Sequence, residues 1–184
     1  RKRYAVIDAF AQNNGHLNVS DARYINAVKL FITGITPLEY NAHRGFAMVG
    51  RSMRGVGPRI ACQMQGIDEL RHAQTQMHSM SHYNRHFNGM HSWPKNFDRM
   101  WYLSVPKSFV NDAMSAGPFE FLTAISFSFE YVLTNLLFMP FMSGAAYNGD
   151  MATVTFGFSA QSDEARHMTL GLECIKFMLE QDPD

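Results

Sequence analysis

A five-residue motif, Asp-Glu-X-Arg-His, occurs twice in the chain, at residues 68–72 and 163–167. Each copy contains a Glu-X-X-His pair. Because residues three apart share one face of an α-helix, both side chains of a pair project the same way. A single pair of this kind is weak evidence for a site. Two copies with the same flanking Asp and Arg are hard to explain by chance, and they predict two helices that present matching faces.

Each motif is preceded by a further glutamate in an apolar, helix-like stretch. Glu39 lies 30 residues before Glu69 (69 − 39), and Glu130 lies 34 residues before Glu164 (164 − 130). The order Glu, Glu-X-X-His, Glu, Glu-X-X-His is the ligand pattern of four-helix bundles that hold two iron or manganese ions. We therefore expect six metal ligands: Glu39, Glu69, His72, Glu130, Glu164 and His167.

The charge of this ligand set supports a site for two metal ions. Four buried carboxylates without cations would cost many kcal/mol, whereas two divalent ions neutralise them. Such oxygen-rich ligation suits iron or manganese, with zinc possible in vitro. The alternative for Glu69 and His72 alone is a solvated helix face with an accidental histidine, and the match of all six positions disfavours it.

The residues flanking the ligands are expected to support them. Asp68 and Asp163 would each accept a hydrogen bond from the non-ligating nitrogen of a coordinating histidine. We expect a crossed arrangement, in which Asp68 serves His167 and Asp163 serves His72. Arg71 and Arg166 would neutralise these aspartates. The alternatives are ordinary surface acids and exposed salt bridges.

Other histidines and the cysteines carry less information. His78, His82 and His86 recur every four residues and could chelate a metal on a helix surface, but solvent-facing polar residues are the favoured interpretation. Cys62 is expected to be a small buried hydrophobe. With Cys174 it makes only two cysteines, which predicts no disulfide framework and a reduced, cytoplasmic setting.

The chain is helical throughout by pattern, since no strand-like alternation of useful length appears. A hydrophobic fraction of 46%, with 15 Phe and 13 Met, fits a densely buried protein. We predict a single catalytic core over residues 1–184: an all-α, ferritin-like four-helix bundle with additional helices. The first expected helix is 4–13. The second runs from Ser20 or Asp21 to about 49 with a distortion at Pro37, and the third runs from about 58 to 88. Short helices are expected within 91–116, followed by one helix over 118–143 and another from 150 onward.

Charge and hydropathy limit the partners. With 16 basic and 16 acidic residues and no basic cluster, nucleic acid is not expected to bind. The stretch from Phe121 to Tyr147 is long enough to span a bilayer. A buried bundle helix has the same composition, and Glu130 at the centre of a span would be costly, so we expect no membrane segment. The chain begins at Arg1 without Met, and we expect it to be an excerpt of a longer polypeptide.

Longer strings in the chain resemble one enzyme family. These include YAVIDAFAQNNGHLNV, IDELRHAQTQ, WYLSVPKSF, SFSFEYVLTNLLF and PFMSGAAYNGDMATVTFGFSAQSDEARHMTLGLE. They resemble the large oxygenase subunit of bacterial multicomponent phenol hydroxylases. That family belongs to the soluble di-iron monooxygenases, with the toluene and methane monooxygenases. The two motifs alone indicate only this superfamily.

The resemblance implies roles for particular residues. Glu39, Glu69 and His72 would bind one iron, and the second set of three the other, with some glutamates bridging. Thr134 would assist proton delivery during oxygen activation; the alternative is a hydroxyl bonded back to its own helix. The substrate pocket would be lined by Ile35, Ala42, Gln76, Phe109, Phe129 and Phe138.

The resemblance also implies the reaction and its partners. Phenol and related arenes would be hydroxylated to catechols with dioxygen and NADH-derived electrons. The chain has no Gly-X-Gly-X-X-Gly fingerprint for a nucleotide, and two cysteines cannot hold an ordinary iron–sulfur cluster. Electrons would come from a separate reductase with FAD and a 2Fe–2S cluster, and a small effector protein and companion hydroxylase subunits would be needed. The alternatives are ferritin-type iron storage and the radical-generating subunit of ribonucleotide reductase.

Overall fold

Every regular element in the described part of the chain is a helix. The computed structural model describes residues 2–19, 21–90 and 93–182. Within these ranges no strand occurs, so the predicted all-α class is confirmed.

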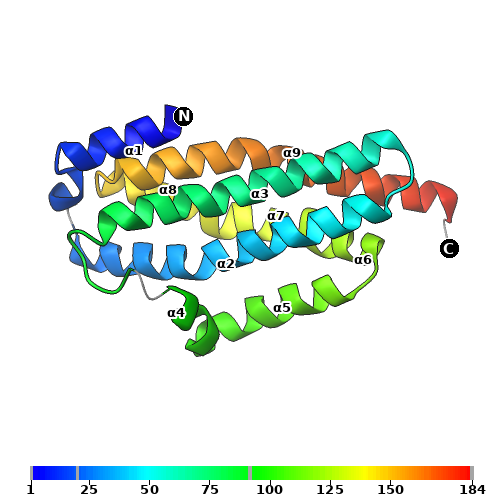
Figure 1. The fold of residues 1–184 in the computed structure, drawn as a ribbon, viewed down its shortest axis with the longest axis horizontal. Helices are drawn as coiled ribbons and strands as arrows, with labels where there is room; N and C mark the ends of the chain where they lie inside the picture. Colours follow the sequence, from blue (N-terminus) through cyan, green and yellow to red (C-terminus); the bar gives the residue numbers. More distant parts are fainter. Residues whose placement is uncertain (1, 20, 91–92, 183–184) are drawn as a thin grey trace.

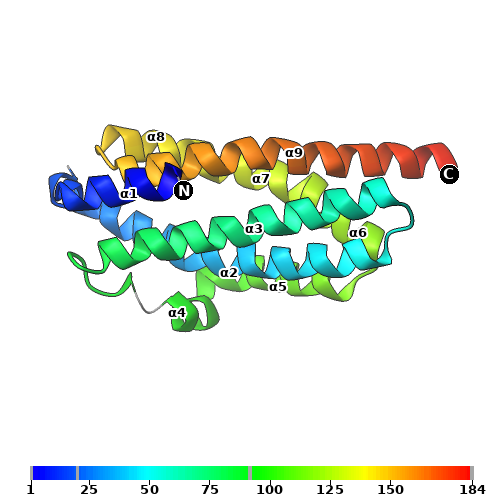
Figure 2. The same cartoon turned by 45° about the horizontal axis from the view of Figure 1, so that its top comes forward.

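Four long helical elements run along the length of the molecule (Figure 1). Three are continuous: α2 (Ala22–Ser52), α3 (Val56–Tyr83) and α9 (Met151–Gln181). The fourth is interrupted and runs from α6 (Pro118–Leu122) to α8 (Met139–Tyr147). Figure 2 shows α2 and α3 side by side in one layer, and α9 with the interrupted element in the other. This is the four-helix bundle that the ligand pattern predicts.

Two π-helical segments interrupt the fourth element. In order it contains α6, η4 (Thr123–Phe129), α7 (Glu130–Leu133), η5 (Thr134–Phe138) and α8. The sequence gives no sign of these segments, and the expected single helix over 118–143 is wrong in this respect and in its end. π-helical turns inside helices are frequent at functional sites. Here they flank the short helix that begins with the expected ligand Glu130.

Close packing against α9 accounts for the position of this element. A Cβ added at Gly171 of α9 would lie 2.7 Å from the backbone nitrogen of Phe127 and 2.7 Å from the carbonyl carbon of Ser126. Only glycine allows this approach. At Gly144 an added Cβ would meet nothing within 4 Å, and the helix continues past this residue to Tyr147 instead of ending there. Glycine lowers helix propensity, but its presence at this position does not end the helix.

The helix ends at the start of the chain follow local signals. After α1 (Lys2–Gln12) the chain reverses through Asn14, which adopts the left-handed conformation at φ 53°. Asp21 caps α2, since its Oδ1 accepts a hydrogen bond of 2.8 Å from the backbone N–H of Arg23. The other expected cap, Ser20, lies outside the described residues. α2 continues as one helix through Pro37, and the expected distortion there stays a prediction.

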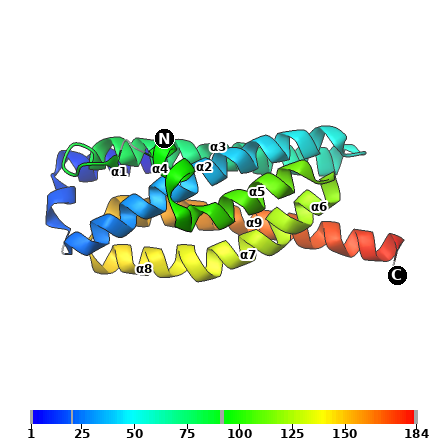
Figure 3. The same cartoon turned by 90° about the horizontal axis from the view of Figure 1, so that it is seen from below.

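The expected connecting region forms short helices on one side of the bundle. They are α4 (Trp93–Arg99), η3 (Trp101–Leu103) and α5 (Ser104–Ser115). Figure 3 shows α5 running beside α2 and α6, and α5 contacts both. This crossover joins α3 to the interrupted element and covers the bundle next to the expected site.

One helix in the described residues, Pro118–Tyr147, is long and apolar enough to cross a membrane by length and composition alone. It packs against α9 within the bundle, and its Glu130 is 4% exposed. These contacts are those of a bundle helix, as the sequence predicts.

Candidate metal centre

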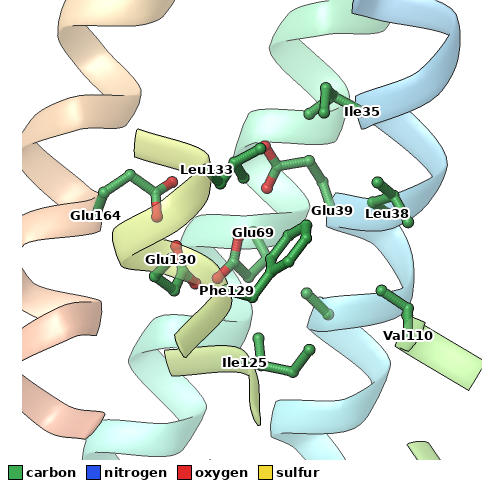
Figure 4. Close-up of a pocket in the computed structure, with 11 residues that line it drawn as sticks. Ile35, Leu38, Glu39, Glu69, Val110, Ile125, Phe129, Glu130, Leu133 and Glu164 are labelled. Carbon is green, nitrogen blue, oxygen red and sulfur yellow. The ribbon is translucent and has the colours of Figure 1, made fainter. Parts of the chain in front are cut away.

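Six carboxylate and imidazole side chains converge in the middle of the bundle. α2 and α7 contribute one glutamate each, and α3 and α9 contribute one Glu-His pair each. Figure 4 shows the four carboxylates pointing toward one another. None of the six is more than 5% exposed. The structure therefore brings together all six expected ligands: Glu39, Glu69, His72, Glu130, Glu164 and His167.

In both histidines, Nδ1 is the ring nitrogen that faces the carboxylates. His72 Nδ1 lies 3.3 Å from Glu164 Oε1 and 3.4 Å from Glu39 Oε2. His167 Nδ1 lies 3.2 Å from Glu69 Oε1 and 3.3 Å from Glu164 Oε2. Glu164 therefore reaches both imidazoles, one with each oxygen.

The candidate ligand atoms fall into two groups that share a residue. Within each group the atoms lie within 4.8 Å of one another; one contains Glu39, Glu69, His72 and Glu164, and the other contains Glu69, Glu130 and His167. Glu69 belongs to both. Two neighbouring positions for a metal ion, with Glu69 and Glu164 between them, follow from this arrangement. The sequence does not show which glutamates lie in the middle.

Burial and charge shift the pKa values of the site in opposite directions. Burial raises the pKa of Glu39 and of Glu130 well above the ordinary value. Burial also opposes charge on Glu69, but the charge of His167, the hydrogen bonds with His72 and Glu39 and the charge of His72 together outweigh it and lower the pKa of Glu69 to about 2. Burial disfavours protonated His72, yet the charge of Glu39 and hydrogen bonds with Asp163, Glu39 and Glu69 together hold its pKa well above the usual range. Without metal, the site thus keeps protons on its imidazoles to balance its carboxylates.

The residues present fit two divalent cations. In the two ligand groups the only nitrogen donors are imidazoles, which are neutral when they coordinate a metal, so four carboxylates call for about four positive charges. Oε1 of Glu39 is buried and has no hydrogen-bond partner within the described structure. Carboxylate oxygens with a few imidazole nitrogens suit iron or manganese.

A ring of charges surrounds the outer side of the two histidines. His72 Nε2 lies 3.1 Å from Asp163 Oδ2 on the opposite helix. His167 Nε2 lies 3.6 Å from Asp68 Oδ2, beyond hydrogen-bond length. Arg71 donates to both aspartates, at 2.7 Å to Asp163, and Arg166 donates to both at 2.9 Å and 2.6 Å. The crossed geometry expected from the sequence is therefore present, with one of its two contacts longer than a hydrogen bond.

Two residues that form a hydrogen-bond chain to the candidate ligand Glu130 were missed by the sequence reasoning. Gln65 Nε2 donates to Glu130 Oε1 at 3.2 Å, and Ser126 Oγ donates to Gln65 Oε1 at 3.2 Å. The serine thereby fixes which end of the amide faces Glu130. Gln65 lies four residues before Glu69, and Ser126 lies four before Glu130. The spacing i, i+4 places each on its ligand's helix face and would have found both.

A small apolar cavity lies beside the carboxylates (Figure 4). Three of the expected pocket residues line it: Ile35, Ala42 and Phe129. The other apolar residues of its wall, not expected from the sequence, are Leu38, Val110, Ile125 and Leu133. Val110 comes from α5, so the crossover closes the cavity on the side away from α9.

The other three expected pocket residues lie outside this wall. Gln76 is buried and accepts a hydrogen bond from Thr36. Phe138 packs edge-on against Phe31, with ring centroids 5.3 Å apart. Phe109 stacks on Phe129 at 5.5 Å, behind the ring that lines the cavity. Helical spacing shows which face a side chain is on, but not whether a neighbour holds it away from the cavity.

Thr134 is buried, and its hydroxyl has no hydrogen-bond partner in the part of the chain that the structure describes. Thr33 and Thr75, by contrast, donate to carbonyl groups of their own helices. The expected alternative, a hydroxyl bonded back to its helix, is thus absent. Thr134 begins η5 and also lines a surface groove beside α9.

The chain matches a family model over residues 1–182, described as methane/phenol/alkene hydroxylase. It is 74% identical over its whole length to the phenol 2-monooxygenase oxygenase component DmpN of Pseudomonas sp. strain CF600, of which it covers 36%. It is 28% identical to the hydroxylase component large subunit of propane 2-monooxygenase from Mycolicibacterium smegmatis, over 96% of the chain and 33% of that protein. The chain therefore spans about a third of the length of these curated relatives.

Two solved structures share the fold. The xenon-pressurised phenol hydroxylase from Pseudomonas sp. OX1 matches 98% of this chain and 36% of that one, with a TM-score of 0.93 and 78% identity. Toluene 4-monooxygenase with toluene bound matches 99% of this chain and 61% of that one, with a TM-score of 0.87. At 14% identity, the second likeness shows the fold alone.

Proposed function

The chain belongs to the methane/phenol/alkene hydroxylase family, and on this premise we propose that residues 1–184 are the di-iron catalytic core of a phenol hydroxylase. The reaction proposed is insertion of one oxygen atom of dioxygen into the ring of phenol or a related arene to give a catechol. The observation that carries the proposal is the convergence of four glutamates and two histidines from four helices on one buried centre.

The six converging residues are the proposed iron ligands. Glu39 and His72 would serve one ion, and Glu130 and His167 the other, with Glu69 and Glu164 placed to serve both. Bound iron would supply the redox chemistry that dioxygen needs. The contact between His72 and Asp163 would hold the proton on Nε2 and leave Nδ1 free to coordinate.

The apolar cavity beside the carboxylates is the proposed arene site. Its wall consists mostly of aliphatic side chains and one aromatic ring, Phe129, which suits a flat apolar ring and excludes water from the reacting atoms. Ile35 and Val110 lie on this wall and would set which ring carbon is presented.

Thr134 is proposed to hold and pass a proton. Its hydroxyl is unpartnered and buried, one helical turn after Glu130, and its residue borders a groove at the surface. A hydroxyl in that position can accept a proton on one side and donate on the other.

The electron supply is proposed to come from other polypeptides. Inserting one oxygen atom and reducing the second to water requires two electrons from outside the arene. A flavin and iron–sulfur reductase would deliver them from NADH, with a small effector protein and companion hydroxylase subunits completing the system. Relatives named as oxygenase or hydroxylase components of multicomponent systems support this division of labour.

The alternatives have less support. A radical-generating ribonucleotide reductase subunit needs a tyrosine beside the metals, and neither the ligand groups nor the cavity wall includes one among the described residues. An iron-storage bundle has no need for an apolar cavity beside its carboxylates that is closed by a crossover helix.

Reconstitution tests the proposal. The purified hydroxylase is mixed with reductase, effector, NADH and phenol, and catechol is measured against mixtures that lack one component. Sustained catechol formation is expected only in the complete mixture. Sustained formation without reductase would refute the electron supply, and iron uptake without any arene oxidation in the complete mixture would favour storage.

A further inference from the structure

Three potential metal ligands meet where α1 crosses α3, away from the carboxylate centre. His78 Nε2 lies 2.7 Å from Asp8 Oδ1, and His82 Nε2 lies 2.8 Å from the same oxygen. The histidines are one helical turn apart on α3. His78 is six residues beyond His72 (78 − 72), about 9 Å further along the helix. The expectation that these histidines face solvent is wrong for His82, which is 7% exposed.

We propose that Asp8, His78 and His82 bind a divalent transition-metal ion that fastens α1 to α3. Two imidazoles and one carboxylate are a donor set for zinc, copper or nickel, whereas magnesium and calcium prefer oxygen ligands alone. All three candidate ligand atoms lie within 4.8 Å of one another.

The geometry requires only a small adjustment. Zinc bonds imidazole nitrogen and carboxylate oxygen at about 2.0–2.2 Å, which places two atoms on one tetrahedral ion roughly 3.3 Å apart. The present separations of 2.7 and 2.8 Å are hydrogen-bond lengths, so Asp8 would retreat by about half an ångström. Its side chain is 40% exposed and that of His78 is 30% exposed, which leaves freedom to move and access for a water as fourth ligand.

His16 of η1 (Gly15–Asn18) lies near His82 and is a candidate acceptor for the second ring proton of a metal-bound His82. Metal at Nε2 of His82 would fix the remaining proton on Nδ1, and coordinating imidazoles usually donate that proton to an acceptor. His82 Nδ1 is buried and unpartnered at present. The ring of His16 lies 6.2 Å from that of His82, is fully buried, and has both nitrogens unpartnered within the described structure. Burial lowers the pKa of His16 to about 4, so the ring stays neutral and keeps a lone pair for this proton.

The attachment of α1 gives the ion a structural role. Ile7 is the one buried residue of this helix. α1 lies beside α9 and α3 at one end of the bundle (Figure 1), and it contacts both. An ion ligated from α1 and α3 would add a fixed link between them.

Zinc is the probe for the test. The iron-loaded protein is equilibrated with Zn²⁺, freed of loose metal, and analysed for both elements. We expect one zinc per chain beyond the metal of the carboxylate centre, with iron content unchanged. His78→Ala and His82→Ala should weaken zinc binding at least about tenfold, since even residues that only support a metal ligand contribute that much.

Two further variants separate a metal site from a hydrogen-bonded cluster. Asp8→Asn keeps an oxygen that accepts from an imidazole but lacks the anionic ligand, so zinc binding should weaken while the helical spectrum is retained. His86→Ala, the control at the third histidine of the series, which lies in the turn after α3, should bind zinc like the parent. Zinc should raise the unfolding temperature of the parent and of His86→Ala only. Absence of the extra zinc in the parent, equal binding by all variants, or zinc that only replaces iron would overturn the proposal.

Discussion

His72 on α3 and Asp163 on α9 lie 3.1 Å apart, Nε2 to Oδ2, so the second Asp-Glu-X-Arg-His motif supports the histidine of the first. The reverse pair, His167 and Asp68, lies at 3.6 Å. The two arginines extend this exchange, because each bonds the aspartates of both motifs. Two halves of the bundle are thereby joined by charged contacts that also aim a candidate ligand. Repetition of the whole motif, rather than of Glu and His alone, follows from this geometry.

Removing Asp163 should loosen iron without unfolding the protein. In Asp163→Ala the Nε2–H of His72 loses its acceptor, and loss of such a partner typically costs 10–100-fold in metal affinity. Iron transfer to a ferrous chelator is the measurement, and transfer should be markedly faster than in the parent. Glu180→Gln, an exposed change on the same helix, is the control. Equal transfer from the two variants would show that Asp163 does not position the ligand.

Packing at Gly171 should be intolerant of a methyl group. Its added Cβ would lie 2.7 Å from backbone atoms of η4, so Gly171→Ala should destabilise by about 1–3 kcal/mol through overpacking. Gly144→Ala is the matched control in open space, and it should be neutral or stabilise by up to about 1 kcal/mol. The test is the free energy of unfolding of both variants, measured with denaturant. Similar values for the two variants would show that Gly171 is not closely packed against η4.

Enlarging the cavity should change product ratios. Ile35→Ala removes wall atoms beside the carboxylates, and a contact of this kind alters discrimination by about 1–3 kcal/mol. We expect a shifted ratio of isomers from a substituted phenol, with iron content unchanged. Ile60→Ala makes the same change at an exposed position of α3, and it should match the parent. Identical ratios in both variants would place the arene elsewhere.

His16 should make stability depend on pH in acid. Burial lowers its folded-state pKa to about 4 from an ordinary 6.5. The neutral ring therefore contributes stability that is complete above about pH 6.5 and is lost as the pH falls from there toward 4. The difference amounts to at most about 3 kcal/mol. Unfolding free energies of the parent and of His16→Gln should converge over this range, and a constant difference would exclude His16 as the cause.

The convergence of the six candidate ligands was the most predictable part of the molecule. Carboxylate and imidazole spacing reports helix faces directly, so the six residues and the crossed aspartates follow from the sequence. The π-helical turns around Glu130 do not, and one of them, η4, packs closely on Gly171 of α9 through Ser126 and Phe127. The burial of His82 depends on where α1 lies, which no local pattern shows.

The lining of the cavity was predictable only in part, because it too depends on tertiary contacts. Ile35, Ala42 and Phe129 reach it, but Gln76 is turned toward Thr36. Val110 was missed because its helix belongs to the crossover, whose placement against α2 is set by tertiary contacts.

Iron content of the two histidine variants is the sharpest test of the assignment of this centre as a metal site. Elemental analysis of the purified parent should give about two irons per chain, as the ligand pattern implies. His72→Ala and His167→Ala each remove one imidazole from a ligand group, and both should lose iron while their helical spectra stay close to that of the parent. Parent-like iron content in both variants would contradict the assignment of this centre as the metal site.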